Sequence, residues 1–266
     1  MLPLAGRAVP ADRQSFTEAL RAGFKALGLE PRAVEATGDD WPCLAHLTLD
    51  LTGAEASRAL RPPGGMEKTG EKMTIGQFSL LAQPLLIEKT PLQIDARFSA
   101  AEAEFMRDRE GALFLSLLSA ESGELDVTIA HSDLERALHS AAAEAAAKHG
   151  AEVKSATLEL ETPTPRSLVF RAAVTAKVFI MKTTVRVRGR VDLDETLSAR
   201  IFGLAAEGEG MLASIVESGL RPHLAKVEGE KFALGGLVAG GLRVRDVSIS
   251  AGPVIQLHAS FADAAG

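Results

Sequence analysis

The longest regular feature of this sequence is an alternation of apolar and polar residues that runs from Leu168 to Ala205. Apolar residues occupy every second position up to Val178, and the alternation then shifts by one position at Phe179. Period-two alternation is typical of strands with one buried face, and a shift of phase marks a turn or a bulge. The segment therefore predicts two long antiparallel strands, followed by a third that begins near Leu197.

Shorter patterns predict the remaining elements. Helices are expected at 12–27, from the spacing of Phe16, Leu20, Phe24 and Leu27, at 100–107, at 132–149 and at 210–226. Ser132 and Glu135 are expected to form a capping box at the start of the third helix. Further strands are expected at 43–51, 73–82, 91–98, 112–118, 125–129, 153–160, 242–250 and 254–261, and a flexible loop at 61–72.

This order of elements predicts the α+β class, with antiparallel strands in place of βαβ units. Within 43–51, Cys43, Ala45 and the leucines at 47, 49 and 51 alternate with more polar residues, which predicts one buried strand face. We expect a single domain over 1–266.

Composition excludes several classes of protein. The chain is 46% hydrophobic but only 5% aromatic, has no Tyr, and carries a net charge of −6, which disfavours a dedicated nucleic-acid binder. Its single cysteine, Cys43, cannot form a disulfide within the chain. The N-terminus lacks the pattern of a secretory signal, and no apolar run reaches the ~20 residues of a spanning helix. We expect a soluble, cytoplasmic protein, or a periplasmic one if a leader was removed.

Motifs for chemistry are scarce. The sequence has no Gly-x-Ser-x-Gly elbow, no phosphate-binding loop and no Cys-x-x-Cys pair. Glu135 and His139 lie four residues apart and form the one pair that a catalytic interpretation would use, although a pair on a helix surface is the commoner explanation. We therefore expect a non-catalytic protein without a metal or another cofactor.

The segment from Arg166 to Arg190 contains seven basic residues and no acidic one. Two interpretations are open. The first is a solvated strand face that discourages aggregation of strands. The second is a surface that docks onto anionic lipid headgroups or an acidic partner, where each basic residue adds ~1 kcal/mol. The candidate docking residues are Lys177, Lys182, Arg186, Arg188 and Arg190.

Several segments resemble a known family. They are 78–86 (FSLLAQPLL), 125–138 (LDVTIAHSDLERAL), Gly208-Glu-Gly210 before an expected helix, and 241–249 (GLRVRDVSI). Together they resemble the LmeA-like bacterial phospholipid-binding proteins of the tubular lipid-binding (TULIP) superfamily. The resemblance extends over about 75–261 and leaves 1–72 outside the pattern. It implies a curved antiparallel sheet around a long helix, with an elongated apolar groove for acyl chains.

These observations together predict a lipid-binding protein that holds a phospholipid or fatty-acid-like ligand. Lipid transfer at anionic membranes is a further role that this prediction leaves open. The residues expected to line the ligand are chosen for their strand and helix faces, and they are Phe170, Val174, Phe179, Met181, Val185, Ile201, Met211 and Ile215. The alternative is a structural or adaptor protein, with a core filled by its own side chains and a basic sheet face for a protein partner.

Overall fold

The structure is a computed structural model, and it describes residues 1–56, 65–148, 150–178, 181–194, 198–209, 225–226, 228–233 and 242–262. The chain forms two compact units. The first comprises the described residues of 1–128, 234–247 and 257–266, and the second those of 129–233 and 248–256. The chain contains two distinct β-sheets, and the single domain over 1–266 stays a prediction.

Ten strands form the first sheet. They are β1 Leu2–Leu4, β2 Ala33–Thr37, β3 Cys43–Asp50, β4 Glu55–Ala56, β5 Glu67–Ile87, β6 Thr90–Arg107, β7 Leu113–Ser119, β8 Ser122–Ala130, β14 Arg243–Ser250 and β15 Val254–Ala262. The main path runs β14-β15-β8-β6-β5-β3-β2, while β4 pairs with β5 and β7 pairs with both β1 and β6. The sheet is mixed, because β3 and β4 run parallel to β5. This corrects the prediction of an entirely antiparallel fold, since β3 and β5 are joined by a crossover and not by a hairpin.

The helix α1 (Arg13–Ala26) covers part of this sheet, and its ends match the prediction. Asp12 caps it by accepting the backbone N–H of Ser15 at 2.7 Å. Phe16, Leu20 and Phe24 of its apolar stripe are buried, whereas Leu27 at its C-cap is exposed. The ring of Phe16 meets Phe105 of β6 edge-on at 6.4 Å. Gly23 allows close approach to β1, because a Cβ there would lie 2.3 Å from the carbonyl oxygen of Pro3.

The alternation of buried residues shifts by one position in three neighbouring strands of the first sheet. Buried residues step from Leu44 to Leu47 in β3, from Ile75 to Phe78 in β5 and from Phe98 to Ala101 in β6. The shifts lie side by side, since Leu44 pairs with Ile75 and Ile75 pairs with Ala101. The row between them contains Ala100, at φ 48°, and Gly76, where a Cβ would lie 2.7 Å from the carbonyl oxygen of Ala45. The alternation predicted for 43–51 is therefore confirmed for the leucines at 47, 49 and 51 but wrong at Cys43 and Ala45, which are exposed while Leu44 is buried.

Two predictions in the first unit are also wrong. Residues 100–107, predicted as a helix, form the end of β6, and residues 67–72, predicted as loop, belong to β5. Alanine and glutamate favour helices in isolation, but Ala101, Ala103 and Phe105 are buried against neighbouring elements. Burial across the sheet has outweighed local propensity.

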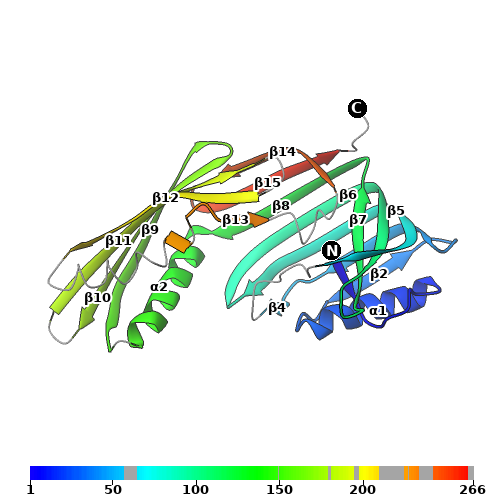
Figure 1. Cartoon of the computed structure of the whole chain (residues 1–266), viewed down its shortest axis with the longest axis horizontal. Coiled ribbons are helices and arrows are strands. Elements are labelled where there is room, and N and C mark those ends of the chain that lie inside the picture. Colours follow the sequence, from blue (N-terminus) through cyan, green and yellow to red (C-terminus); the bar gives the residue numbers. More distant parts are fainter. Residues whose placement is uncertain are drawn as a thin grey trace. The chain divides into compact units, whose positions relative to one another are not determined.

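The second sheet is antiparallel throughout, in the order β13-β12-β11-β10-β9. Its strands are β9 Glu152–Thr164, β10 Ser167–Val178, β11 Met181–Leu193, β12 Ser198–Glu209 and β13 Lys231–Ala233. β10 and β11 pair along their whole length, which confirms the two long strands predicted from the shift of phase. The helix α2 (His131–Ala147) packs along β9 (Figure 1).

The predicted capping box of α2 is absent. The helix begins at His131 after Ala130, and no side chain caps it. Glu135 instead accepts the backbone N–H of Leu158 in β9, at 3.0 Å. The Glu135 carboxylate thus links α2 to β9, because the outward-facing N–H of Leu158 needs an acceptor. The helix predicted at 210–226 lies almost entirely outside the described residues.

Candidate functional site

Four of the predicted lining residues lie in the described part of the second sheet, at Phe170 and Val174 in β10, Val185 in β11 and Ile201 in β12. Val174 pairs with Val185, and Val191 pairs with Ile201. Residues directly opposite one another in a ladder share a face, so all four side chains lie on one face of the sheet. Phe179, Met211 and Ile215 lie outside the described residues. Met181 is the first residue of β11, and the structure describes its backbone but not its side chain.

We call this surface the apolar face. Its members are Ala156, Leu158 and Leu160 of β9, Leu168, Phe170, Ala172, Val174 and Ala176 of β10, Thr183, Val185, Val187, Gly189, Val191 and Leu193 of β11, and Ala199, Ile201, Leu204, Ala206 and Gly208 of β12. Thr183, Gly189, Leu193 and Ala199 are buried, whereas all the others stay half-buried. A sheet face that is packed on a core is normally buried throughout, so this apolar face retains accessible area.

Phe170 occupies the middle of the apolar face. A Cβ at Gly189 would lie 2.7 Å from Cζ of Phe170 and 2.8 Å from Cδ2 of Leu204. The ring therefore covers Gly189 from the neighbouring strand and approaches Leu204 in the next one. Only glycine leaves room for this contact.

Beyond Phe170, toward the turn that joins β10 and β11, the side chains of the apolar face are small. We call this part the hairpin half, and it comprises Ala156, Leu158, Ala172, Val174, Ala176, Thr183, Val185, Val187, Ala206 and Gly208. Alanine and glycine leave space above a sheet that larger residues would fill. The hairpin half therefore offers a shallow aliphatic surface with no charged group.

Thr183 is the one polar side chain of the hairpin half. It pairs with Ala176 across β10 and β11 and is only 5% exposed. Its hydroxyl group has no hydrogen-bond partner among the residues that the structure describes. A buried hydroxyl without a partner costs about 1–3 kcal/mol, so this group marks a place where a further polar atom would be stabilising.

The opposite face of the sheet carries the basic residues, and acidic residues of the neighbouring strands, or in one case of the same strand, pair with most of them. The ion pairs are Arg171 with Glu161 at 2.7 Å, Arg186 with Glu209 at 2.7 Å, Arg188 with Glu207 at 3.6 Å and Arg190 with Asp192 at 2.6 Å. The absence of acidic residues along 166–190 thus does not produce an uncompensated basic surface, because β9 and β12 supply carboxylates on either side. For these arginines, the pairing favours the interpretation as a solvated strand face.

The pair of Arg171 and Glu161 changes the ionisation of both groups. The hydrogen bond and then the charge of Arg171 lower the pKa of Glu161, and the same hydrogen bond raises the pKa of Arg171. Both side chains are exposed to solvent, so the pair contributes little to stability.

Lys177 and Lys182 differ from the arginines. They lie directly opposite one another beside the β10–β11 turn. Glu152 pairs with Lys177 in the ladder, and no ion-pair partner of Lys182 occurs among the residues that the structure describes. Like charges placed opposite one another are unfavourable, and Glu152 already supplies a negative charge beside Lys177, so Lys182 is the group that can attract a further negative charge.

Glu135 and His139, the one candidate catalytic pair, do not form a site. The carboxylate of Glu135 accepts the Leu158 N–H, and His139 is exposed with no polar partner in the described part of the chain. Their arrangement matches the ordinary explanation of residues on a helix surface.

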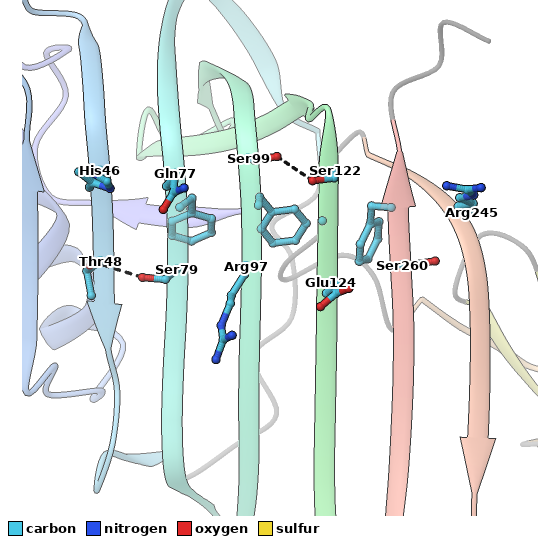
Figure 2. A pocket seen from close by; sticks show the side chains of 14 residues that line it. His46, Thr48, Gln77, Ser79, Arg97, Ser99, Ser122, Glu124, Arg245 and Ser260 are labelled. Carbon is cyan, nitrogen blue, oxygen red and sulfur yellow. Dashed lines mark hydrogen bonds between the residues drawn. The ribbon is translucent and has the colours of Figure 1, made fainter.

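A second candidate region lies on the first sheet, where a hollow of about 530 Å³ opens over several strands (Figure 2). Its polar lining consists of His46, Thr48, Gln77, Ser79, Arg97, Ser99, Ser122, Glu124, Arg245 and Ser260. The ladder aligns them in rows, since His46 pairs with Gln77 and Gln77 with Ser99. The hollow arises because short hydroxyl side chains stand between longer polar ones.

Hydrogen bonds within the hollow link neighbouring strands. Ser99 and Ser122 share one at 2.7 Å, and Ser79 donates to Thr48 at 3.3 Å. These contacts occupy hydroxyl groups in cross-strand pairing, which stabilises a sheet. Beside the hollow, Asp126 lies 3.0 Å from Nδ1 of His258. The lining has charges of both signs and selects for neither cations nor anions.

In the part of the chain that the structure describes, no three His, Cys, Asp or Glu side chains come close enough to hold a metal ion. The described helices are too short or too polar to cross a bilayer. Comparisons with known protein families, with curated proteins and with solved structures found no match for this chain.

Proposed function

We propose that the apolar face of the second sheet binds the acyl chain of a lipid, without catalysis. The observation that supports this is the accessible hairpin half, whose small aliphatic side chains stay half-buried in the folded chain. An acyl chain is the ligand class that matches such a surface, because it needs no hydrogen bonds and each methylene removed from water contributes about 0.8 kcal/mol. The tubular lipid-binding fold with an elongated groove, implied by the family resemblance, belongs to the same proposal.

The proposal includes approach to an anionic membrane, which we assign to the hairpin end. Arg186, Arg188 and Arg190 have carboxylate partners within the sheet, so they have less to gain from lipid headgroups. Lys177 and Lys182 are the remaining members of the predicted docking set, and they flank the turn. A cationic turn beside an aliphatic surface suits a lipid that enters by its chain and keeps its headgroup near the lysines.

A substitution that fills the hairpin half tests the acyl-chain proposal. Ala172 lies on the apolar face opposite Val187, and its neighbour Ala173 lies on the charged face opposite Arg186. Ala172→Phe should lower the affinity for a fluorescent fatty acid at least tenfold, because the ring would occupy the space of the chain. Ala173→Phe adds the same ring to the other face and should leave the affinity unchanged.

The measurement is displacement of the fluorescent fatty acid, combined with native mass spectrometry of the purified protein. Equal affinities in the two phenylalanine variants would place any binding elsewhere. If the unaltered protein neither binds the fatty acid nor carries co-purified lipid, the proposal is wrong. That result would favour the alternative, a structural or adaptor protein.

A further inference from the structure

The buried hydroxyl of Thr183 identifies one point on the apolar face with an unmet polar requirement. The side chain lies on the same face as Val185, two positions from the start of β11, and Ala176 stands opposite it. The residues of the apolar face around it are apolar, and its oxygen has no hydrogen-bond partner in the described part of the chain. A valine would fit the same space without this cost, so the hydroxyl is not explained by packing alone.

We propose that the ligand of the apolar face is a long-chain fatty acid or acyl ester, and that Thr183 donates a hydrogen bond to its carboxyl or ester oxygen. The inference rests on the proposed function, because it assumes an acyl chain on the hairpin half. It specifies the orientation of the bound ligand. The polar end lies near the β10–β11 turn, and the acyl chain extends from there toward Phe170.

The charges near the turn agree with this direction. Lys177 and Lys182 lie opposite one another one residue further toward the turn than Ala176 and Thr183, so their side chains start from the charged face and approach the polar end of the ligand only around the end of the hairpin. Lys182 is exposed, and the opposed ammonium groups favour a negatively charged group nearby. At the other end of the hairpin, Arg190 is already paired with Asp192 at 2.6 Å.

The length of the apolar face also accommodates a chain in this direction. β11 rises ~3.4 Å per residue, so the face extends over roughly 30 Å from Thr183 to Leu193. Phe170 stands over Gly189 on the way and limits the most open part to the hairpin half. A chain that begins at Thr183 therefore lies first over small side chains.

The test compares Thr183→Val with Thr183→Ser. Valine keeps the shape and removes the hydroxyl, whereas serine keeps the hydroxyl. The probes are a saturated long-chain fatty acid, its methyl ester and the hydrocarbon dye diphenylhexatriene. In Thr183→Val the affinity for the acid and the ester should fall about five- to tenfold, with dye binding unchanged, and Thr183→Ser should retain the affinity of the unaltered protein.

Thermal unfolding without ligand supplies a second readout. Since valine removes an unpaired buried hydroxyl, Thr183→Val should unfold at the same temperature as the unaltered protein or a higher one. If the fatty acid binds both variants with unchanged affinity while the dye still binds, the inference about Thr183 is overturned and the proposed function stands. If neither the acid nor the dye binds the unaltered protein, the proposed function fails.

Discussion

At the scale of single residues, both sheets place a phenylalanine ring over a glycine of the adjacent strand. In the first sheet Phe98 covers Gly123, and in the second Phe170 covers Gly189. The ring of Phe98 also approaches Phe261, at 5.4 Å between ring centres. An aromatic side chain over a cross-strand glycine restores the contact area that the glycine lacks.

This packing predicts a specific sensitivity at Gly123. A Cβ there would lie 2.3 Å from Cδ1 of Phe98, so Gly123→Ala requires the ring to move. We expect the free energy of unfolding to fall by about 1–3 kcal/mol, as measured by urea denaturation. Gly252→Ala is the matched control, because the nearest atom to its new Cβ lies at 3.9 Å. Equal stability of the two variants would contradict this account of Phe98.

Neither glycine contact was visible in the sequence. Phe170 and Gly189 were both expected on the inner side of their strands, yet their contact depends on a register in which each faces the other. The sequence likewise placed Thr183 on the same face as Val185, but its unmet hydrogen bond depends on which side chains surround it. Alternation within one strand tells which face of the sheet a side chain lies on, whereas the contacts of that side chain depend on how the strands pair.

At the scale of elements, carboxylates satisfy backbone N–H groups along both edges of the second sheet. Glu135 of α2 accepts from Leu158 in β9. On the other edge, Glu228 accepts the N–H groups of Gly203 and Leu204 in β12, at 2.8 and 2.9 Å. Unpaired N–H groups at a sheet edge invite pairing with another chain, so these carboxylates limit edge-to-edge association.

Removal of one of these carboxylates should be detectable at the amides themselves. In Glu228→Ala, amide hydrogen exchange at Gly203 and Leu204 should accelerate about tenfold, because each N–H loses its acceptor. NMR spectroscopy resolves the two sites separately. Glu230→Ala is the control, since no hydrogen bond or ion pair involves its side chain in the described structure. Unchanged exchange in Glu228→Ala would exclude the proposed protection.

The elements themselves were predicted well where the pattern was long and regular. The β10–β11 hairpin and α1 follow directly from periods of two and of about 3.6 residues. The prediction failed at 100–107, where Ala and Glu favour a helix that burial prevents. It also failed around Ala45, because a shift shared by three strands has no signature within any one of them. The crossover that makes β3 parallel to β5 depends on contacts far apart in the sequence.

At the scale of the whole molecule, the positions of the charged residues say more about electrostatic attraction than the net charge does. The chain has a net charge of −6, and the basic residues of β10 and β11 are set between acidic residues of β9 and β12. Among the described residues of these strands, Lys182 beside the β10–β11 turn departs from this balance, whereas its neighbour Lys177 lies opposite Glu152. Attraction to an anionic surface should therefore be local to the turn.

Two double variants separate local attraction from net charge. Lys177→Gln with Lys182→Gln should reduce co-sedimentation with vesicles that contain anionic lipid, by roughly tenfold in affinity at low salt. Arg186→Gln with Arg188→Gln changes the net charge equally but removes residues that are already paired, so its effect should be smaller. Added salt should weaken binding of the unaltered protein. Equal losses in both double variants would contradict docking through the turn.

The row of irregular positions in the first sheet has a consequence for how the sheet assembles. β5 and β6 are 21 and 18 residues long, and strands of such length can pair in several shifted alignments. Only the native alignment brings the irregular positions near Ala45, Gly76 and Ala100 side by side. Any slipped pairing would oppose an irregular residue to a regular one and bury polar side chains. The irregular positions that disturb the alternation thus favour the native register of β3, β5 and β6 over slipped registers during folding.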